Sequence, residues 1–91
     1  MKFAVVTGAS SGLGETFARK LAARGYSLLL AARRVQRLEA LKLELERQNK
    51  VEVECFPCDL AKPAETEGLA ARLEAGATPD LLVNNAGFGT L

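Results

Sequence analysis

Hydrophobic residues in this chain follow two spacings, and each spacing predicts a different kind of element. Short apolar runs at residues 3–6, 27–32 and 80–84 predict strands. The run at 27–32 is nearly continuous, which is typical of a strand covered on both faces of a parallel sheet. Residues 51–56 instead alternate apolar with charged side chains, which predicts a strand at or near a sheet edge, ended by Pro57.

Apolar residues recur at helical spacing in the segments between these strands. The first helix follows a glycine-rich loop and ends at Gly25, the second spans residues 35–50, and the third begins at Pro63 and ends before Gly76. The side chains expected to face inward are Phe17, Ala18, Leu21 and Ala22 in the first helix, Val35, Leu38, Leu41 and Leu45 in the second, and Leu69, Ala70 and Leu73 in the third.

The strict alternation of strands and helices predicts the fold class. Right-handed crossovers turn such a series into an α/β fold, a parallel sheet with helices on both faces. In the Rossmann winding, four strands and three helices would give the strand order 3-2-1-4, a partial sheet of this type. No linker, repeat or low-complexity segment interrupts the 91 residues, so we expect a single domain over residues 1–91.

The stretch from Thr7 to Gly14 joins the first strand to the first helix and is a candidate phosphate site. The first turn of a helix offers unpaired N–H groups and the positive end of the helix dipole, which favour an anion. Glycines allow the tight turn and the close approach of a pyrophosphate. Three glycines alone also fit an ordinary loop, but the position between strand and helix favours the binding site. Its residues are Gly8, Ser10, Ser11, Gly12, Leu13 and Gly14.

Composition and charge exclude several classes of partner. The chain is 48% hydrophobic and 25% charged, with 12 basic and 11 acidic residues, which is typical of an ordinary globular domain. A net charge of +1 without a basic face predicts no nucleic-acid partner. No apolar run is long enough to span a bilayer, so we expect a cytoplasmic protein without a membrane partner. Histidine is absent, and no metal site is expected.

Three motifs together resemble the N-terminal part of the short-chain dehydrogenase/reductase family over essentially the whole chain. Thr7 to Gly14 matches the family's T-G-x-x-x-G-x-G cofactor loop. Asp59-Leu60 matches the acidic residue after strand three that contacts the adenine ring, and Asn84-Asn85-Ala86-Gly87 matches the N-N-A-G stretch that closes strand four. The resemblance therefore implies a nicotinamide dinucleotide as cofactor, held by these residues.

The end of the second strand favours NADP(H) over NAD(H). An acidic residue there would bind the ribose 2′-hydroxyl and repel a 2′-phosphate, but this chain has Ala32. Arg33 and Arg34 follow, and a guanidinium suits bidentate contact with a phosphate. The alternative is that both arginines are merely solvated residues at the start of the second helix.

No catalytic residue is predicted in this chain. The family resemblance implies a tyrosine, a lysine four residues later and an upstream serine, but Tyr26 is followed four residues on by Leu30. We therefore expect the cofactor-binding half of a longer reductase that moves a hydride between nicotinamide and a carbonyl or alcohol substrate, with the 91 residues inactive alone. The alternative is a noncatalytic nucleotide-binding or dimerisation module that functions at this length.

Two further features leave open interpretations. Cys55 and Cys58 form a C-x-x-C pair, which could be a redox dithiol, although small buried residues are the better interpretation. The fourth strand would have an unpaired outer edge, which predicts a homo-oligomer formed across residues 80–84.

Overall fold

The computed structural model describes residues 2–76 and 78–84. Strands and helices alternate over this range as the apolar spacing predicts. The elements are β1 (Phe3–Thr7), α1 (Gly12–Ala23), β2 (Ser27–Ala32), α2 (Val35–Asn49), β3 (Val53–Pro57), α3 (Pro63–Ala75) and β4 (Leu81–Asn84).

Some element ends differ by one or two residues from the prediction, β3 most of all. It begins at Val53 and includes Pro57, whereas we expected residues 51–56. The Cys58 amide continues the ladder by donating to the Ala32 carbonyl at 2.9 Å, so the amide positions at residues 54 and 56 face β2. Pro57 therefore lacks its N–H on the outer side of an edge strand, where no ladder bond is lost.

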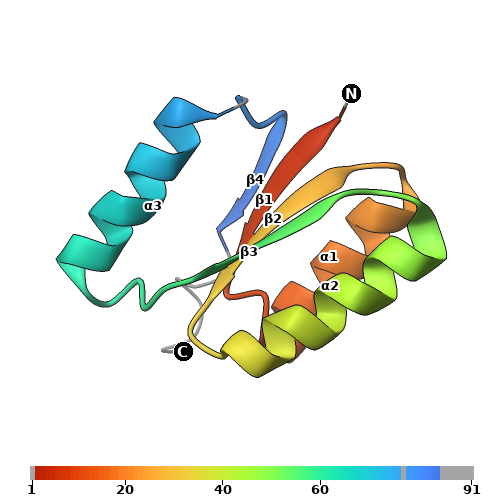
Figure 1. The fold of residues 1–91 in the computed structure, drawn as a ribbon, viewed down its shortest axis with the longest axis horizontal. Coiled ribbons are helices and arrows are strands. Elements are labelled where there is room, and N and C mark those ends of the chain that lie inside the picture. The colour runs from red at the N-terminus through yellow and green to blue at the C-terminus, as the bar shows by residue number, and fades with distance from the viewer. Residues whose placement is uncertain (1, 77, 85–91) are drawn as a thin grey trace.

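All four strands are parallel and lie in the predicted order β3-β2-β1-β4. The central strand β1 pairs with β2 on one side, Val5 opposite Leu29, and with β4 on the other, Val5 opposite Leu82. The carboxyl ends of the strands consequently meet at one edge of the sheet, and the loop after β1 leaves from the middle of that edge (Figure 1).

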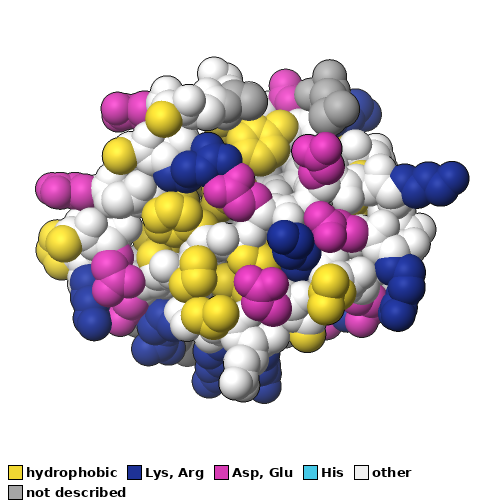
Figure 2. Space-filling model, in the orientation of Figure 1, with side chains coloured by type: hydrophobic (Ala, Val, Ile, Leu, Met, Phe, Trp, Pro, Cys, Tyr) yellow, Lys and Arg dark blue, Asp and Glu magenta, His cyan; other side chains and the backbone are white. Residues whose placement is uncertain are grey.

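The helices divide between the two faces of the sheet. Figure 1 shows α1 and α2 together on one face and α3 alone on the other. Side chains alternate accordingly along β1, since Ala4 and Val6 belong to the cluster under α1 and α2 while Val5 belongs to the cluster under α3. In Figure 2, hydrophobic side chains remain visible beside α3 among charges of both signs, so one helix covers only part of its face.

Three inward-facing predictions are wrong. Phe17 is 37% exposed, Val35 is 45% exposed and Ala70 is exposed as well. Phe17 and Ala70 lie one residue, about 100° around the helix, from the buried Ala18 and Leu69, whereas Val35 is the first residue of α2 and lies three positions before its first buried residue, Leu38. The helical period therefore identified the correct stripes but overestimated their width.

The outer strand β4 is the most exposed part of the sheet. Leu81 is 40% and Leu82 57% exposed, and β4 pairs with β1 alone among the described strands. Within residues 2–76 and 78–84, no helix has the length and apolar character needed to cross a membrane.

Candidate functional site

The loop between β1 and α1 is held in shape by Gly8 and Ser11. Gly8 has a φ of 64°, in the left-handed region that glycine adopts without strain. Ser11 is the N-cap residue of α1, and its hydroxyl accepts from the Gly14 amide at 3.2 Å and donates to the Gly8 carbonyl at 2.9 Å. The loop is thus a tight turn that leads straight into a helix N-terminus, as the sequence predicts.

The outer surface of this loop is open. Ser11, Gly12 and Leu13 are exposed, Leu13 by 53%, whereas Gly14 is buried under the helix. A Cβ placed on Gly12 would meet no atom within 4 Å apart from its chain neighbours and the backbone of its own helix, so the described chain leaves room beside this glycine. An anionic group could therefore approach the N-terminus of α1 directly.

Thr7 connects the loop to the end of β4. This side chain is only 4% exposed, and its hydroxyl lies 3.3 Å from the Val83 carbonyl and 3.1 Å from Oδ1 of Asn84. The first residue of one predicted motif thus contacts the first residue of another. Asn85, Ala86 and Gly87, the rest of the N-N-A-G stretch, lie outside the described residues.

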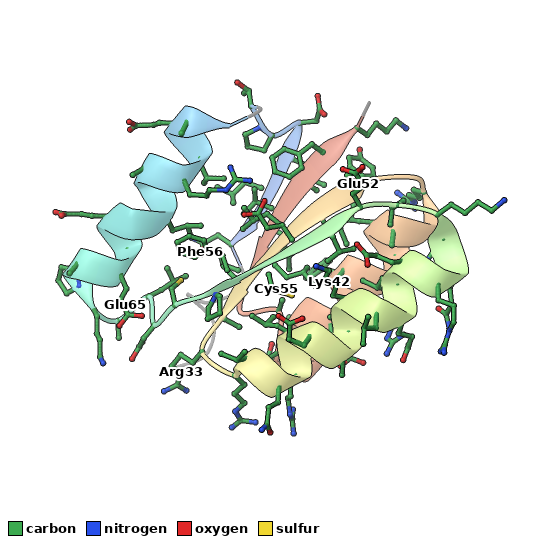
Figure 3. All side chains as sticks on the ribbon, viewed as in Figure 1. Arg33, Lys42, Glu52, Cys55, Phe56 and Glu65 are labelled. Atoms are coloured by element: carbon green, nitrogen blue, oxygen red, sulfur yellow. The ribbon has the colours of Figure 1, made fainter. Side chains whose placement is uncertain are left out.

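Arg33 and Arg34 lie at the same edge of the sheet as the loop. The Ala9 amide donates to the Ala31 carbonyl at 3.3 Å, which brings the loop beside the end of β2. Both arginines are exposed, and Arg34 is the N-cap residue of α2 without a side-chain capping bond. Figure 3 shows Arg33 at the turn from β2 to α2, pointing away from the sheet. Two exposed arginines therefore follow β2 at the edge of the sheet where the loop into α1 lies.

A third arginine, which the sequence analysis did not single out, reaches the loop itself. Nη1 of Arg37 donates to the Ser10 carbonyl at 3.2 Å. Arg37 lies in the first turn of α2, whereas Arg33 precedes the helix. The signal that could have identified Arg37 is its place at the N-terminal end of this helix, close in sequence to the two arginines that follow β2.

Asp59 and Leu60 lie in the connection from β3 to α3. The Asp59 amide donates to Oε1 of Glu65 at 2.8 Å, and its own Oδ1 accepts from the Ala61 amide at 3.0 Å. The Leu60 side chain packs against the cluster under α3. Glu65 was not expected from the sequence to take part in this loop.

The two cysteines lie on opposite faces of the sheet. Cys55 packs against the cluster under α1 and α2, and its thiol donates to the Leu38 carbonyl at 3.3 Å, whereas Cys58 belongs to the cluster under α3. Figure 3 shows the alternation directly, with Cys55 toward α2 and Phe56 toward α3. Burial raises the pKa of Cys55 to about 11 and also raises the pKa of Cys58. Both findings favour structural cysteines over a redox pair.

Other candidate chemistry is sparse in the described residues. No group of three or more His, Cys, Asp or Glu side chains within residues 2–76 and 78–84 could hold a metal ion. Tyr26 packs against the core, and Nζ of Lys2 lies 5.4 Å from the centre of its ring. The tyrosine therefore has a packing role in this structure.

Taken together, the parallel sheet and the glycine loop at its carboxyl edge define an α/β domain of the Rossmann type. The loop after β1 lies where the strand order reverses, the position at which open α/β sheets bind their ligands.

The chain belongs to the short chain dehydrogenase family, whose model matches residues 2–91. It is similar to a fatty acyl-CoA reductase of Acinetobacter baylyi, with 41% identity over 87 residues that cover 94% of this chain and 29% of the reductase. It is also similar to a short-chain dehydrogenase of Sphingobium yanoikuyae solved with NADPH, with 40% identity, a TM-score of 0.88 and coverage of 93% of this chain and 33% of the other.

A second solved structure is the alcohol dehydrogenase of the archaeon Thermococcus sibiricus, complexed with 5-hydroxy-NADP. The two chains share 43% identity with a TM-score of 0.84, over 90% of this chain and 35% of that enzyme. This chain therefore spans about a third or less of the length of the relatives that it matches.

Proposed function

We propose that this chain is the NADP(H)-binding part of a short-chain oxidoreductase, which transfers a hydride between nicotinamide and a carbonyl or alcohol substrate. The observation that carries the proposal is the open N-terminus of α1 beside two exposed arginines at the end of β2. Family membership supports it, as do the similar enzymes solved with NADPH and 5-hydroxy-NADP.

Each part of the candidate site has a distinct role in this proposal. The glycine loop would hold the pyrophosphate, with the hydroxyls of Ser10 and Ser11 assisting its backbone amides. Arg33 would bind the 2′-phosphate with help from Arg34, and Asp59 with Leu60 would contact the adenine. The strand-end stretch from Asn84 to Gly87 would line the adenosine side. The loop residues are Gly8, Ser10, Ser11, Gly12, Leu13 and Gly14.

The chemical step is assigned to residues outside these 91. When bound, NADPH supplies a hydride to the carbonyl carbon, and a proton must reach the carbonyl oxygen from an acid. The relatives are about three times longer than the matched region, which supports a single cofactor-binding domain within a larger enzyme. A reading frame that continues into Tyr-x-x-x-Lys would agree with this proposal. A stop codon after Leu91 would favour the noncatalytic nucleotide-binding or dimerisation module.

The test of the cofactor assignment is the Arg33→Ala variant, titrated with NADP⁺ and NAD⁺. We expect the affinity for NADP⁺ to fall on the order of tenfold to a hundredfold, because a charged hydrogen-bonding partner of the 2′-phosphate is lost. The affinity for NAD⁺ should barely change. Arg47→Ala is the matched control, since Arg47 is an exposed arginine in the last turn of α2, the helix that follows Arg33. Equal losses for both dinucleotides would contradict the role of Arg33.

We also propose that the chain forms a homo-oligomer through β4. Leu81 and Leu82 are exposed on the outer strand, and an uncovered strand with apolar side chains pairs readily with another chain. Leu82→Lys should shift the mass measured by light scattering toward the monomer, while Leu43→Lys, at an exposed leucine on α2, should leave it unchanged. A wild-type monomer at high concentration would refute this. The cytoplasmic location stays a prediction of the sequence.

A further inference from the structure

The connection from β3 to α3 is held by two sets of hydrogen bonds. One set is internal and shapes the turn: Oδ1 of Asp59 accepts from the Ala61 amide at 3.0 Å, and the Asp59 carbonyl accepts from the Lys62 amide at 3.0 Å. These bonds form an Asx-type turn, which fixes the local conformation. They do not fix the position of the turn relative to the rest of the domain.

The second set ties this turn to α3 through side chains of its first helical turn. Oε1 of Glu65 accepts from the Asp59 amide at 2.8 Å. The Thr66 hydroxyl lies 3.1 Å from the Leu60 carbonyl and 3.2 Å from the Lys62 carbonyl, and it donates its one hydrogen to either. Figure 3 shows Glu65 at the start of α3, beside the connection from β3. The Glu65 bond is short and involves a carboxylate, the stronger kind of bond to an amide. Lys62 lies 3.7 Å from the other oxygen of Glu65 and partly neutralises it.

The helix itself has few other attachments, so this contact matters for where the turn lies. Leu69 is the one buried residue of α3, Leu73 packs partly buried against the same cluster, and the ion pair of Arg72 with Glu54 of β3 lies towards the far end of the helix. The segment before Asp59 is fixed independently, because the Cys58 amide donates to β2 at the Ala32 carbonyl. Glu65 therefore ties the Asp59 amide to α3, at a point between a fixed strand and a lightly packed helix.

We propose that Glu65 is a positioning residue that aims the Asp59 carboxylate at the exocyclic amine of adenine. This inference rests on the proposed function, in which Asp59 contacts the adenine. Oδ1 of Asp59 is engaged by the Ala61 amide, and within the described residues no hydrogen bond reaches Oδ2. Oδ2 is thus the acceptor for the N6 amine, a group that adenine carries and hypoxanthine lacks. Hypoxanthine presents a carbonyl oxygen at that place, and the carboxylate repels it.

The experiment compares NADP⁺ with its hypoxanthine analogue in wild type, Glu65→Ala and Glu65→Gln. Wild type should bind NADP⁺ on the order of tenfold more tightly than the analogue. Glu65→Ala should bring this ratio close to one, because Asp59 is no longer held in place. Glu65→Gln should retain the preference, because its amide oxygen still accepts from the Asp59 amide. Glu67→Ala, at an exposed acid on the same helix, is the matched control and should not change the ratio.

The ratio of the two affinities separates a positioning role from a general loss of stability, since destabilisation would lower the affinities for NADP⁺ and for its hypoxanthine analogue alike. Asp59→Ala should also abolish the preference, and the double variant with Glu65→Ala should lose nothing further, because both residues act through one contact. A Glu65→Ala variant that keeps the wild-type preference would overturn the inference.

A second readout needs no cofactor. Hydrogen exchange of the Asp59 amide, measured by NMR in the free chain, should be at least about tenfold faster in Glu65→Ala than in wild type or Glu65→Gln. Unchanged exchange would refute the role of Glu65 even if NADP⁺ binds normally. Exchange that responds as expected in a chain that binds neither dinucleotide would support the contact between Glu65 and Asp59, but it would contradict the proposal that these 91 residues bind the cofactor by themselves, and with it the base preference.

Discussion

The Ser11 hydroxyl is predicted to act on both stability and binding, and two substitutions separate these effects. In the structure the hydroxyl caps α1 by accepting from the Gly14 amide and donates to the Gly8 carbonyl. Ser11→Ala removes both bonds, and loss of an N-cap costs about 1 kcal/mol. For a domain of this size that lowers the melting temperature by about 4–8 °C, which thermal unfolding followed by far-ultraviolet circular dichroism measures.

Ser11→Asp keeps the capping acceptor and places a negative charge at the positive end of the helix dipole, so its stability should stay within a few tenths of a kcal/mol of wild type. The same charge should repel a pyrophosphate bound at this turn. At about 5 Å and an effective dielectric constant of about 20, the repulsion is about 3 kcal/mol, or a loss on the order of 100-fold in affinity for NADP⁺. Calorimetric titration measures that loss.

These two variants can each refute part of the reasoning. An unchanged melting temperature for Ser11→Ala would mean that the cap does not stabilise α1. A stable Ser11→Asp that binds NADP⁺ as tightly as wild type would mean that the phosphates do not lie at this helix N-terminus. A Ser11→Asp variant that is as stable as wild type but does not bind NADP⁺ would support the proposed site.

Two further predictions concern Arg37 and the cysteines. Because Arg37 holds the Ser10 carbonyl, Arg37→Met should lower the affinities for NADP⁺ and NAD⁺ by the same factor, about two- to tenfold in titrations. A selective loss of affinity for NADP⁺ would instead mean that Arg37 contacts the 2′-phosphate directly. Burial raises the pKa of Cys55 from 9.0 to about 11, so its thiol in a Cys58→Ala variant should react slowly with an aromatic disulfide at pH 8. The neutral thiol favours folding below pH 9, and stability should fall as the pH rises from 9 to about 11; fast reaction at pH 8 would contradict this.

The sequence predicted those features of the fold that depend on local chemistry. Gly8 and Ser11 identified the turn into α1, and the apolar periods identified every strand and helix, while the strand order came from the Rossmann winding expected of such a series. The opposite faces of Cys55 and Cys58 also follow from strand alternation, since Cys58 comes three positions after Cys55, an odd number. The exposure of Phe17 did not follow, because a helical period gives the direction of a buried stripe but not its width.

The side-chain contacts within the site could not be predicted in the same way. Thr7 meets Asn84 across 77 residues of sequence, and only the pairing of β1 with β4 brings them together. Glu65 resembles any acid in the first turn of a helix, where the dipole alone would explain it. Its bond to Asp59 depends on the conformation of a turn for which no local pattern gave a signal.

The most direct test of the account is a pair of calorimetric titrations of the 91-residue chain, one with NADP⁺ and one with NAD⁺. The proposed site predicts that both bind through the loop at α1, with NADP⁺ at least about tenfold tighter because the arginines after β2 meet the 2′-phosphate. Equal affinities, or a preference for NAD⁺, would contradict the assignment of the cofactor. Binding of neither would show that these residues do not form a working cofactor site by themselves.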